Sequence, residues 1–340
     1  MPFDPIVALA FFVFGLVFGS FANVCIHRLP RRILAQDELA ELDRQPPADQ
    51  PSAERERLRA ELRASSVVGP RSACPACKTQ IRWYDNIPLL SWLLLGGRCR
   101  HCRAPISLRY PAVELLTALL FLACYARFGA TLAAAKFCLL SFLLVALIFT
   151  DARWRLLPDA LTFPGLGLGL AFSFAVPVND AFLRMLAGMG LPVAARSPAL
   201  ASFLQALAGA AAGASFIYGA GMIYKRARGV EGMGLGDAKL MAMIGAFVGV
   251  GLTVFTLFTA SLLGSVFGLA TVLSVWVRRT RRRMTRRSEP FAAARRHAWR
   301  SAVLVYRHFE LPFGVFLGSM ALAAAFFGNA LMAWYWERFP

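Results

Sequence analysis

Charged residues, and acidic ones above all, are scarce in this sequence. Only 16% of its 340 residues are charged, whereas 58% are hydrophobic. Soluble proteins average about 25% charged and about 45–50% apolar residues, so this chain has too few charges to solvate the surface of a soluble domain. The same excess of apolar residues excludes an intrinsically disordered chain. The composition therefore predicts a membrane protein.

The shortage of acidic residues leaves a large positive charge. Asp and Glu number 19 against 37 Lys and Arg, which gives a formal net charge of +18. A nucleic-acid-binding protein would gather such charges on one soluble face. Here the basic residues lie in the connections between apolar runs, where they fix membrane topology and contact anionic lipid. We therefore expect anionic lipid, and no nucleic acid, as a partner of the basic loops.

Eight apolar segments are predicted to cross or enter the membrane. The first, residues 6–26, is uncharged and long enough to span a hydrocarbon core of about 30 Å. It has no basic region before it and no small-residue cleavage site after it, so we interpret it as a retained helix and not as a signal peptide. The run at 238–250 is short, which leaves seven or nine spans as alternatives. The other segments are 112–128, 131–150, 160–178, 201–224, 238–250, 252–277 and 312–336.

The distribution of Lys and Arg predicts the orientation of these spans. Residues 27–110 carry 15 of them and residues 278–310 carry 11 Arg, while residues 179–200 have only Arg184 and Arg196. With eight spans, all strongly basic connections fall on one side of the membrane, which the positive-inside rule makes cytoplasmic. Both termini then face the periplasm.

The fold expected from these patterns is an all-α polytopic membrane protein of about eight transmembrane helices. Residues 33–70 combine a Pro-rich stretch with dense charge, which predicts a flexible or partly helical surface insertion. Residues 278–300 directly follow a span, which favours a topology anchor. The chain then divides into three parts. Residues 1–26 form a first transmembrane segment, residues 27–110 a cytoplasmic loop, and residues 111–336 a transmembrane domain that contains a basic cytoplasmic loop at 278–310.

Four cysteines in the first cytoplasmic loop form two C-x-x-C pairs separated by 21 residues. Such pairs resemble the two knuckles of a zinc ribbon, whose thiolates close a tetrahedral site. A disulfide or redox pair is the alternative, but lasting disulfides are rare in the reducing cytoplasm. We expect a structural zinc with four protein ligands, with His101 as a bystander and the remaining cysteines as buried apolar residues. The expected ligands are Cys74, Cys77, Cys99 and Cys102.

Two aspartates lie at the predicted cytoplasmic ends of spans. Asp151 directly follows an apolar run, and Asp237 ends the sequence Gly234-Leu-Gly236-Asp237 and opens the next run. Two nearby carboxyls share one proton, so one serves as general base toward water and the other as general acid. Such a pair hydrolyses a peptide bond without a nucleophilic Ser or Cys. The alternative for each aspartate alone is helix capping.

Two further acids adjoin the spans. Asp159 precedes an apolar run and is expected to cap the following helix. Glu114 lies inside the start of the second span, where a buried acid needs a partner. We expect it to pair with Arg109 or with an arginine of the loop, and a role toward protons or substrate stays open.

Together these motifs resemble type IV prepilin peptidase, a GxGD aspartic protease, in order and over nearly the whole chain. GxGD alone is a weak signal, whereas the ordered set is specific. The set comprises Gly19-Ser-Phe-Ala-Asn23, His27-Arg28-Leu-Pro30, the C-x-x-C pairs with Asn86-Ile-Pro88 between them, Arg109-Tyr-Pro-Ala-Val-Glu114, Asp151 with Leu157-Pro158-Asp159, Glu231-Gly-Met-Gly-Leu-Gly-Asp237-Ala-Lys239 and Leu311-Pro-Phe-Gly314.

The resemblance implies a bifunctional enzyme of the bacterial inner membrane. Such enzymes cleave the basic leader from type IV prepilins and type II secretion pseudopilins, then methylate the new amino terminus with S-adenosylmethionine. Carried over by motif, Asp151 and Asp237 are the catalytic pair, and the cysteine loop belongs to the methyltransferase side. The family's Pro-Phe-Gly-Pro motif here ends in Val315. No glycine-rich Rossmann-type loop is present, so methyl transfer rests on the resemblance.

Other readings of the sequence remain as alternatives. One is a peptidase without methyltransferase activity. Another is a proton-coupled transporter that relays protons through Asp151, Glu114 and Asp237, which is disfavoured because the acids cluster at one face and no internal repeat is evident. A third is a non-catalytic assembly factor that holds a secretion complex through its zinc loop.

Overall fold

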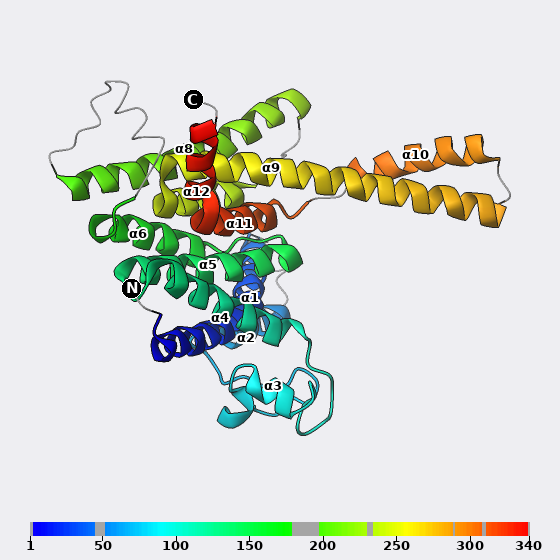
Figure 1. Ribbon diagram of the computed structural model, residues 1–340. Helices are drawn as coiled ribbons and strands as arrows, with labels where there is room; N and C mark the ends of the chain where they lie inside the picture. The colour runs from blue at the N-terminus through cyan, green and yellow to red at the C-terminus, as the bar shows by residue number, and fades with distance from the viewer. Residues whose placement is uncertain are drawn as a thin grey trace.

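The computed structural model shown in Figure 1 describes residues 3–44, 52–178, 197–229, 234–287, 290–307 and 311–338. In these residues the chain forms helices and turns, with isolated bridges but no β-strand. The prediction of an all-α protein is confirmed. The helices are α1 (Pro5–Asp43), α2 (Ser52–Ala64), the 3-10 turn η2 (Trp83–Asn86), α3 (Leu90–Leu94), α4 (Arg109–Phe128), α5 (Leu132–Trp154), α6 (Asp159–Ala175), α8 (Pro198–Arg228), α9 (Leu235–Arg287), α10 (Phe291–Arg307), α11 (Phe313–Ala323), the π-helical turn η3 (Ala324–Gly328) and α12 (Asn329–Arg338).

The membrane helices are built from the apolar runs of the sequence. Within the described residues, six helices are long and apolar enough to span a bilayer: α1, α4, α5, α8, α9 and the run Phe313–Trp334 through α11 and α12. Helix α6 is apolar but shorter. A multi-pass membrane protein is therefore confirmed, while the number of eight spans stays a prediction.

Helix α9 changes direction at Gly249, whose φ of 81° lies in a region that L side chains rarely adopt. Met241 and Thr253 flank this glycine in sequence, yet both come within 3.1 Å of the position that a Cβ on Gly213 would occupy. In a straight helix they would be about 18 Å apart, at about 1.5 Å per residue. The two halves of α9 therefore fold back on each other, and the turn coincides with the predicted break between two apolar runs.

Helices α1, α4 and α5 pack against one another (Figure 1). Gly19 of α1 lies against Glu114 of α4, and one turn further along α1 the Asn23 amide donates to the Tyr110 carbonyl at 3.0 Å. The later residue of α1, Asn23, contacts the earlier residue of α4, Tyr110, so these two helices are antiparallel. The short turn at 129–131 makes α5 antiparallel to α4 in the same way. One face of the bundle consequently contains the end of the predicted α1 span, the start of α4 and the end of α5.

Helix α1 extends well beyond the predicted first span and ends only at Asp43. Its extension packs on α2, and Ala35 and Leu58 are buried there. Residues 33–70 are therefore helical over much of their described length, because a few apolar side chains on one face of each charged helix are enough to bury against the other. The part of this insertion that directly precedes α2 lies outside the described residues.

The basic connection after the α9 span is a helical hairpin and not a loop. The second half of α9 continues to Arg287, and α10 returns beside it, so that the pair projects from the bundle (Figure 1). The rings of Trp276 and Trp299 meet edge to face at 5.9 Å, and the Arg279 guanidinium donates to the Ser301 carbonyl at 3.0 Å. The edge-to-face contact, the hydrogen bond and the buried alanines Ala294, Ala298 and Ala302 hold this charged hairpin together. Its turn and its last residues lie outside the described residues.

Candidate functional site

The last turn of α5 carries Asp151, whose side chain is buried. The Val315 amide, in the first turn of α11, donates a hydrogen bond to Oδ2 of this aspartate at 3.0 Å. A Cβ on the neighbouring Gly314 would lie only 2.9 Å from the same oxygen. A glycine is therefore needed for α11 to approach closely enough that its backbone holds the carboxyl group.

The second aspartate, Asp237, lies in the first turn of α9 and is half-buried. Leu157, in the connection between α5 and α6, packs against two glycines. Its Cβ is 3.2 Å from a Cβ built on Gly236, and its Cδ1 is 3.3 Å from one built on Gly314. This packing brings the start of α9 to the end of α5, where the carboxyls of Asp151 and Asp237 interact electrostatically. The structure thus brings together the two aspartates that the sequence singled out.

A buried pair of carboxyl groups is suited to acid–base chemistry. Ionising both members would place like charges near each other at a partly buried position, which favours a pair that shares one proton. The ionised member accepts a proton and the protonated member donates one. Asp151 does not cap α5, because the dipole at the carboxyl end of a helix disfavours a negative charge, but its carboxylate accepts from the first turn of α11, so capping of α11 stays an alternative role.

The expectation that Asp159 caps α6 is wrong in detail. The N-cap position is occupied by Pro158, and Asp159 stands in the first turn, where its carboxylate accepts two hydrogen bonds of 2.8 Å from Lys239 Nζ. Because Lys239 follows Asp237 by two residues, this ion pair fastens the start of α9 to the start of α6. Glu231, from the same motif, lies outside the described residues.

Glu114 joins the bundle to the cysteine loop. The structure gives it a backbone partner where the sequence predicted an arginine: the Leu89 amide donates to Oε2 at 2.7 Å. The Ser20 hydroxyl also hydrogen-bonds the carboxylate. Leu89 has a φ of 62° and stands at the N-cap position of α3. The sequence indicated that an acid at the start of a span needs a hydrogen-bond partner, but it did not identify that partner.

The four cysteines of the loop converge. Their Sγ atoms all lie within 4.8 Å of one another, and those of Cys74 and Cys102 are 3.8 Å apart. A tetrahedral zinc with bonds of about 2.3 Å would hold its sulfur ligands about 3.8 Å apart. The donor set and its spacing therefore fit a zinc ion.

The two C-x-x-C pairs form matching knuckles. In the first, the Lys78 amide donates to the Cys74 carbonyl at 2.9 Å, and Lys78 has a φ of 59°. In the second, the Arg103 amide donates to the Cys99 carbonyl at 3.0 Å, and Arg103 has a φ of 58°. The sequence signal for this local repeat, which was missed, is a basic residue directly after each C-x-x-C.

Polar contacts prepare the loop for a metal. Hydrogen bonds from the Thr79 side chain and amide lower the pKa of the Cys77 thiol to about 6, whereas the pKa of the neighbouring Cys102 thiol is raised to about 11, so the thiols of the cluster differ in acidity. Beside the second knuckle, hydrogen bonds from the Arg100 guanidinium hold the pKa of Asp85 below its ordinary value. The Trp92 indole donates to the Ile106 carbonyl at 3.2 Å and closes the loop behind the cysteines.

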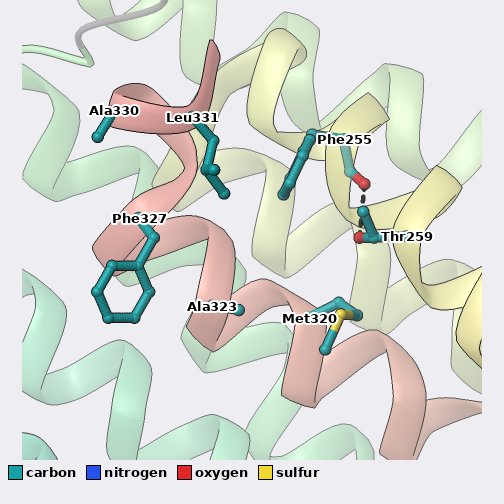
Figure 2. Close-up of a pocket in the computed structure, with 7 residues that line it drawn as sticks. All are labelled: Phe255, Thr259, Met320, Ala323, Phe327, Ala330 and Leu331. Carbon is teal, nitrogen blue, oxygen red and sulfur yellow. Dashed lines mark hydrogen bonds between the residues drawn. The ribbon is translucent and has the colours of Figure 1, made fainter. Parts of the chain in front are cut away.

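A separate pocket of about 510 Å³ lies between the second half of α9 and the helices α11 and α12 (Figure 2). Thr259 supplies its polar atom, and this hydroxyl already donates to the Phe255 carbonyl at 2.7 Å. No lining residue is ionisable, so the pocket offers space to an apolar group but no chemistry. Its lining residues are Phe255, Thr259, Met320, Ala323, Phe327, Ala330 and Leu331.

Two family models match consecutive parts of the chain. The Bacterial Peptidase A24 N-terminal domain matches residues 13–128, and the Type IV leader peptidase family matches residues 138–269. The prepilin leader peptidase/N-methyltransferase of Aeromonas salmonicida is 35% identical over 327 residues, which cover 95% of this chain and 92% of the relative. The protein of the same name from Pseudomonas aeruginosa is 38% identical over 259 residues, 75% of this chain and 77% of the relative.

The chain belongs to the type IV leader peptidase family. The resemblance drawn from the motifs is thereby confirmed. No solved structure matches the chain. In this leader peptidase the boundary between the two family models falls in the α4–α5 hairpin: Glu114 and the four cysteines lie on the N-terminal side, and Asp151 and Asp237 lie on the peptidase side.

The cysteine site generates a metal-content prediction. Purified protein should carry about one zinc per chain, and Cys99→Ser should lose most of it, because removal of one thiolate opens the tetrahedral site. Inductively coupled plasma mass spectrometry measures the metal. Cys124→Ala removes a buried thiol outside the cluster and should keep the zinc. Wild-type protein purified without zinc, or a Cys99→Ser variant with full zinc content, would contradict the assignment.

Proposed function

We propose that this leader peptidase cleaves the basic leader from type IV prepilins or type II secretion pseudopilins and then N-methylates the new amino terminus. The observation that carries the proposal is the meeting of Asp151 and Asp237 beside the backbone of α11. The names of the relatives, prepilin leader peptidase/N-methyltransferase, supply the substrate class and the second activity.

Cleavage follows from the carboxyl pair. The ionised aspartate takes a proton from a water molecule, and the water oxygen attacks the scissile carbonyl carbon. The protonated aspartate donates its proton to the carbonyl oxygen as the carbon becomes tetrahedral, which gives a gem-diol. As the C–N bond breaks, the first aspartate passes its proton to the leaving amine, and the second takes a proton back from a gem-diol hydroxyl as the carbonyl re-forms. Asp151 and Asp237 can exchange roles in this scheme, since the pair holds one proton at the beginning and at the end.

The substrate is expected to reach this site from within the membrane. A prepilin is an apolar helix with a basic leader on its cytoplasmic side. Asp151 ends the α5 span and Asp237 begins the α9 span, so both carboxyls stand at the depth where such a helix emerges. A leader that carries Lys or Arg complements the negative charge of the pair.

The proposed orientation places this face in the cytoplasm of a bacterial cell, with the protein in the inner membrane. Helix α8 ends with Lys225, Arg226 and Arg228 directly before the segment that leads to Asp237. The basic end of α9 and α10 belongs to the same side when α9 turns back at Gly249. By the positive-inside rule this side is cytoplasmic, both termini are periplasmic, and the hairpin of α9 and α10 contacts anionic lipid.

Zinc and the methyl donor have separate places in the proposal. Cys74, Cys77, Cys99 and Cys102 would hold a structural zinc, which fixes the fold of the cytoplasmic loop. S-adenosylmethionine would supply the methyl group transferred to the amino terminus that cleavage exposes. The hydrogen bonds from Leu89 to Glu114 and from Arg28 to the Ser66 carbonyl tie this loop to the bundle beside the peptidase pair.

Removal of either carboxylate should abolish leader cleavage. In Asp151→Asn and Asp237→Asn the amide neither accepts the proton from water nor shares one, so the rate should fall by at least about 10²–10⁴-fold. Mass spectrometry of a co-expressed prepilin reports the cleaved and methylated masses together. Asp43→Asn removes a surface carboxylate that pairs with Arg55 and should cleave at the wild-type rate. Cleavage retained in Asp237→Asn would refute the assignment of the pair.

The amide of Val315 is a further point to test, because a proline at this position of the family motif has no N–H to donate. Val315→Pro removes the hydrogen bond to Asp151 and should lower kcat about tenfold, as expected for loss of a hydrogen bond to a charged group. Val315→Ala keeps the amide and should stay near the wild-type rate. Equal rates for the two variants would show that the hydrogen bond is irrelevant to cleavage.

A further inference from the structure

A group of basic side chains gathers at one face of the bundle, where α1 leaves its predicted span, α4 begins and α5 ends. Four arginines lie close enough to the His27 imidazole to interact with it electrostatically. We call this group the basic junction. It comprises His27, Arg28 and Arg31 of α1, Arg109 of α4 and Arg153 of α5.

Helix register independently places these residues together. Asn23 donates to the Tyr110 carbonyl, so His27, one turn beyond Asn23, comes beside the start of α4 and Arg109. On the other side, Phe21 of α1 stacks on Phe142 of α5 at 5.8 Å. Helices α1 and α5 run parallel, so His27, six residues after Phe21, is level with residue 148. The basic junction is therefore within about one turn of the depth of Asp151.

None of the ion pairs among the described residues involves a cation of the basic junction, although Asp151 and Glu114 lie within a turn or so of it. The described residues form ion pairs elsewhere, between Arg55 and Asp43, Arg57 and Glu54, Arg100 and Asp85, and Lys239 and Asp159. Two buried polar atoms at the same helix ends, His27 Nδ1 and Trp154 Nε1, also have no hydrogen-bond partner among the described residues. Buried polar atoms are nearly always paired, so these two, beside a group of arginines, leave room for a polar ligand.

The cytoplasmic loop covers the basic junction. The Arg28 guanidinium donates to the Ser66 carbonyl at 2.7 Å and to the Pro70 carbonyl at 2.6 Å. The Leu89 amide reaches Glu114 on the neighbouring face of α4. The Arg28 contacts hold the segment between α2 and the first knuckle against α1, and the Leu89 contact holds the segment between the two knuckles against the start of α4. A ligand that enters from the cytoplasm fits this position better than a lipid that must enter from the bilayer.

We propose that the basic junction binds the carboxylate of S-adenosylmethionine, with Arg109 as its main partner. The inference rests on the proposed methyltransferase function. Guanidinium groups bind carboxylates in a planar, two-bond arrangement, which makes arginine the suited residue for this group. Asp151 and Glu114, within a turn or so of the junction, offer negative charge toward the cationic sulfonium and ammonium of the same molecule. The methyl donor then stands at the depth where cleavage exposes the new amino terminus.

Equilibrium dialysis of the full-length protein in detergent tests this site without turnover. The probe is S-adenosylhomocysteine, which keeps the carboxylate but has no methyl group to transfer. Arg109→Gln should raise its Kd about tenfold or more, while leader cleavage stays at the wild-type rate. Arg109→Lys should recover part of the affinity. Arg127→Gln makes the same change of charge at the opposite, exposed end of α4 and should leave the Kd unchanged.

Further arms separate the possible results. Decarboxylated S-adenosylmethionine should bind wild type and Arg109→Gln alike, because it lacks the group that Arg109 recognises. An unchanged Kd for S-adenosylhomocysteine in both Arg109→Gln and Arg153→Gln overturns the proposal. The proposal is also overturned if Arg109→Gln binds S-adenosylhomocysteine as wild type does but is no longer thermally stabilised by phosphatidylglycerol nanodiscs. The ligand of the junction is then a lipid phosphate. If wild type neither cleaves a prepilin nor binds the probe, the proposed function itself fails. Arg153→Gln also serves if Arg109→Gln does not fold.

Discussion

The packing of Leu157 between Gly236 and Gly314 is the contact on which the site depends. It holds three elements that are far apart in sequence, the end of α5, the start of α9 and the start of α11, close enough for two carboxyls and one backbone amide to meet. A Cβ at Gly314 would strike the Asp151 carboxyl at 2.9 Å, and one at Gly236 would press on Leu157 at 3.2 Å. The ion pair between Asp159 and Lys239 also fastens the start of α9 to the start of α6. The carboxyl pair is therefore a product of helix packing and not of a local loop.

The cysteine loop is a second unit that depends on this bundle for its position. Its own fold is local, since two equivalent knuckles and a bidentate contact between Arg100 and Asp85 shape it around the cysteines. Its attachment is a small number of polar contacts with the ends of α1 and α4, of which the bond between Leu89 and Glu114 is one. The basic junction lies under this attachment.

Much of this arrangement could be predicted from the sequence because it depends on composition and order. Apolar runs of bilayer length predicted the helices, charge in the connections predicted the face that carries Asp151 and Asp237, and C-x-x-C spacing predicted the cysteine cluster. The partners of Glu114 and Asp159 could not be predicted, since a buried or terminal carboxylate demands a donor but the pattern does not say whether an amide, a lysine or an arginine supplies it. Helix α1 also continues past its span, because charged residues prolong a helix whenever one face finds something to pack on.

The departure at Val315 illustrates what a motif alone leaves out. In the sequence, Val315 stands where the family motif has a proline, and the motif alone does not tell what this replacement changes. In the structure it is the residue whose amide reaches Asp151 at 3.0 Å. A side chain that departs from the family pattern thus supplies a hydrogen bond through its backbone, and only the approach of α11 over Gly314 makes that visible.

The most direct test of the account is chemical cross-linking between positions 151 and 237. In a background with Cys25, Cys124 and Cys138 replaced by Ala, the double variant Asp151→Cys with Asp237→Cys is treated with a short bifunctional thiol reagent. Mass spectrometry should then find a peptide that joins α5 to α9. The pair Asp159→Cys with Lys239→Cys, whose native side chains are 2.8 Å apart, serves as the positive control. Cross-linking of the control without any of the 151–237 product would contradict the claim that the bundle brings the two aspartates together.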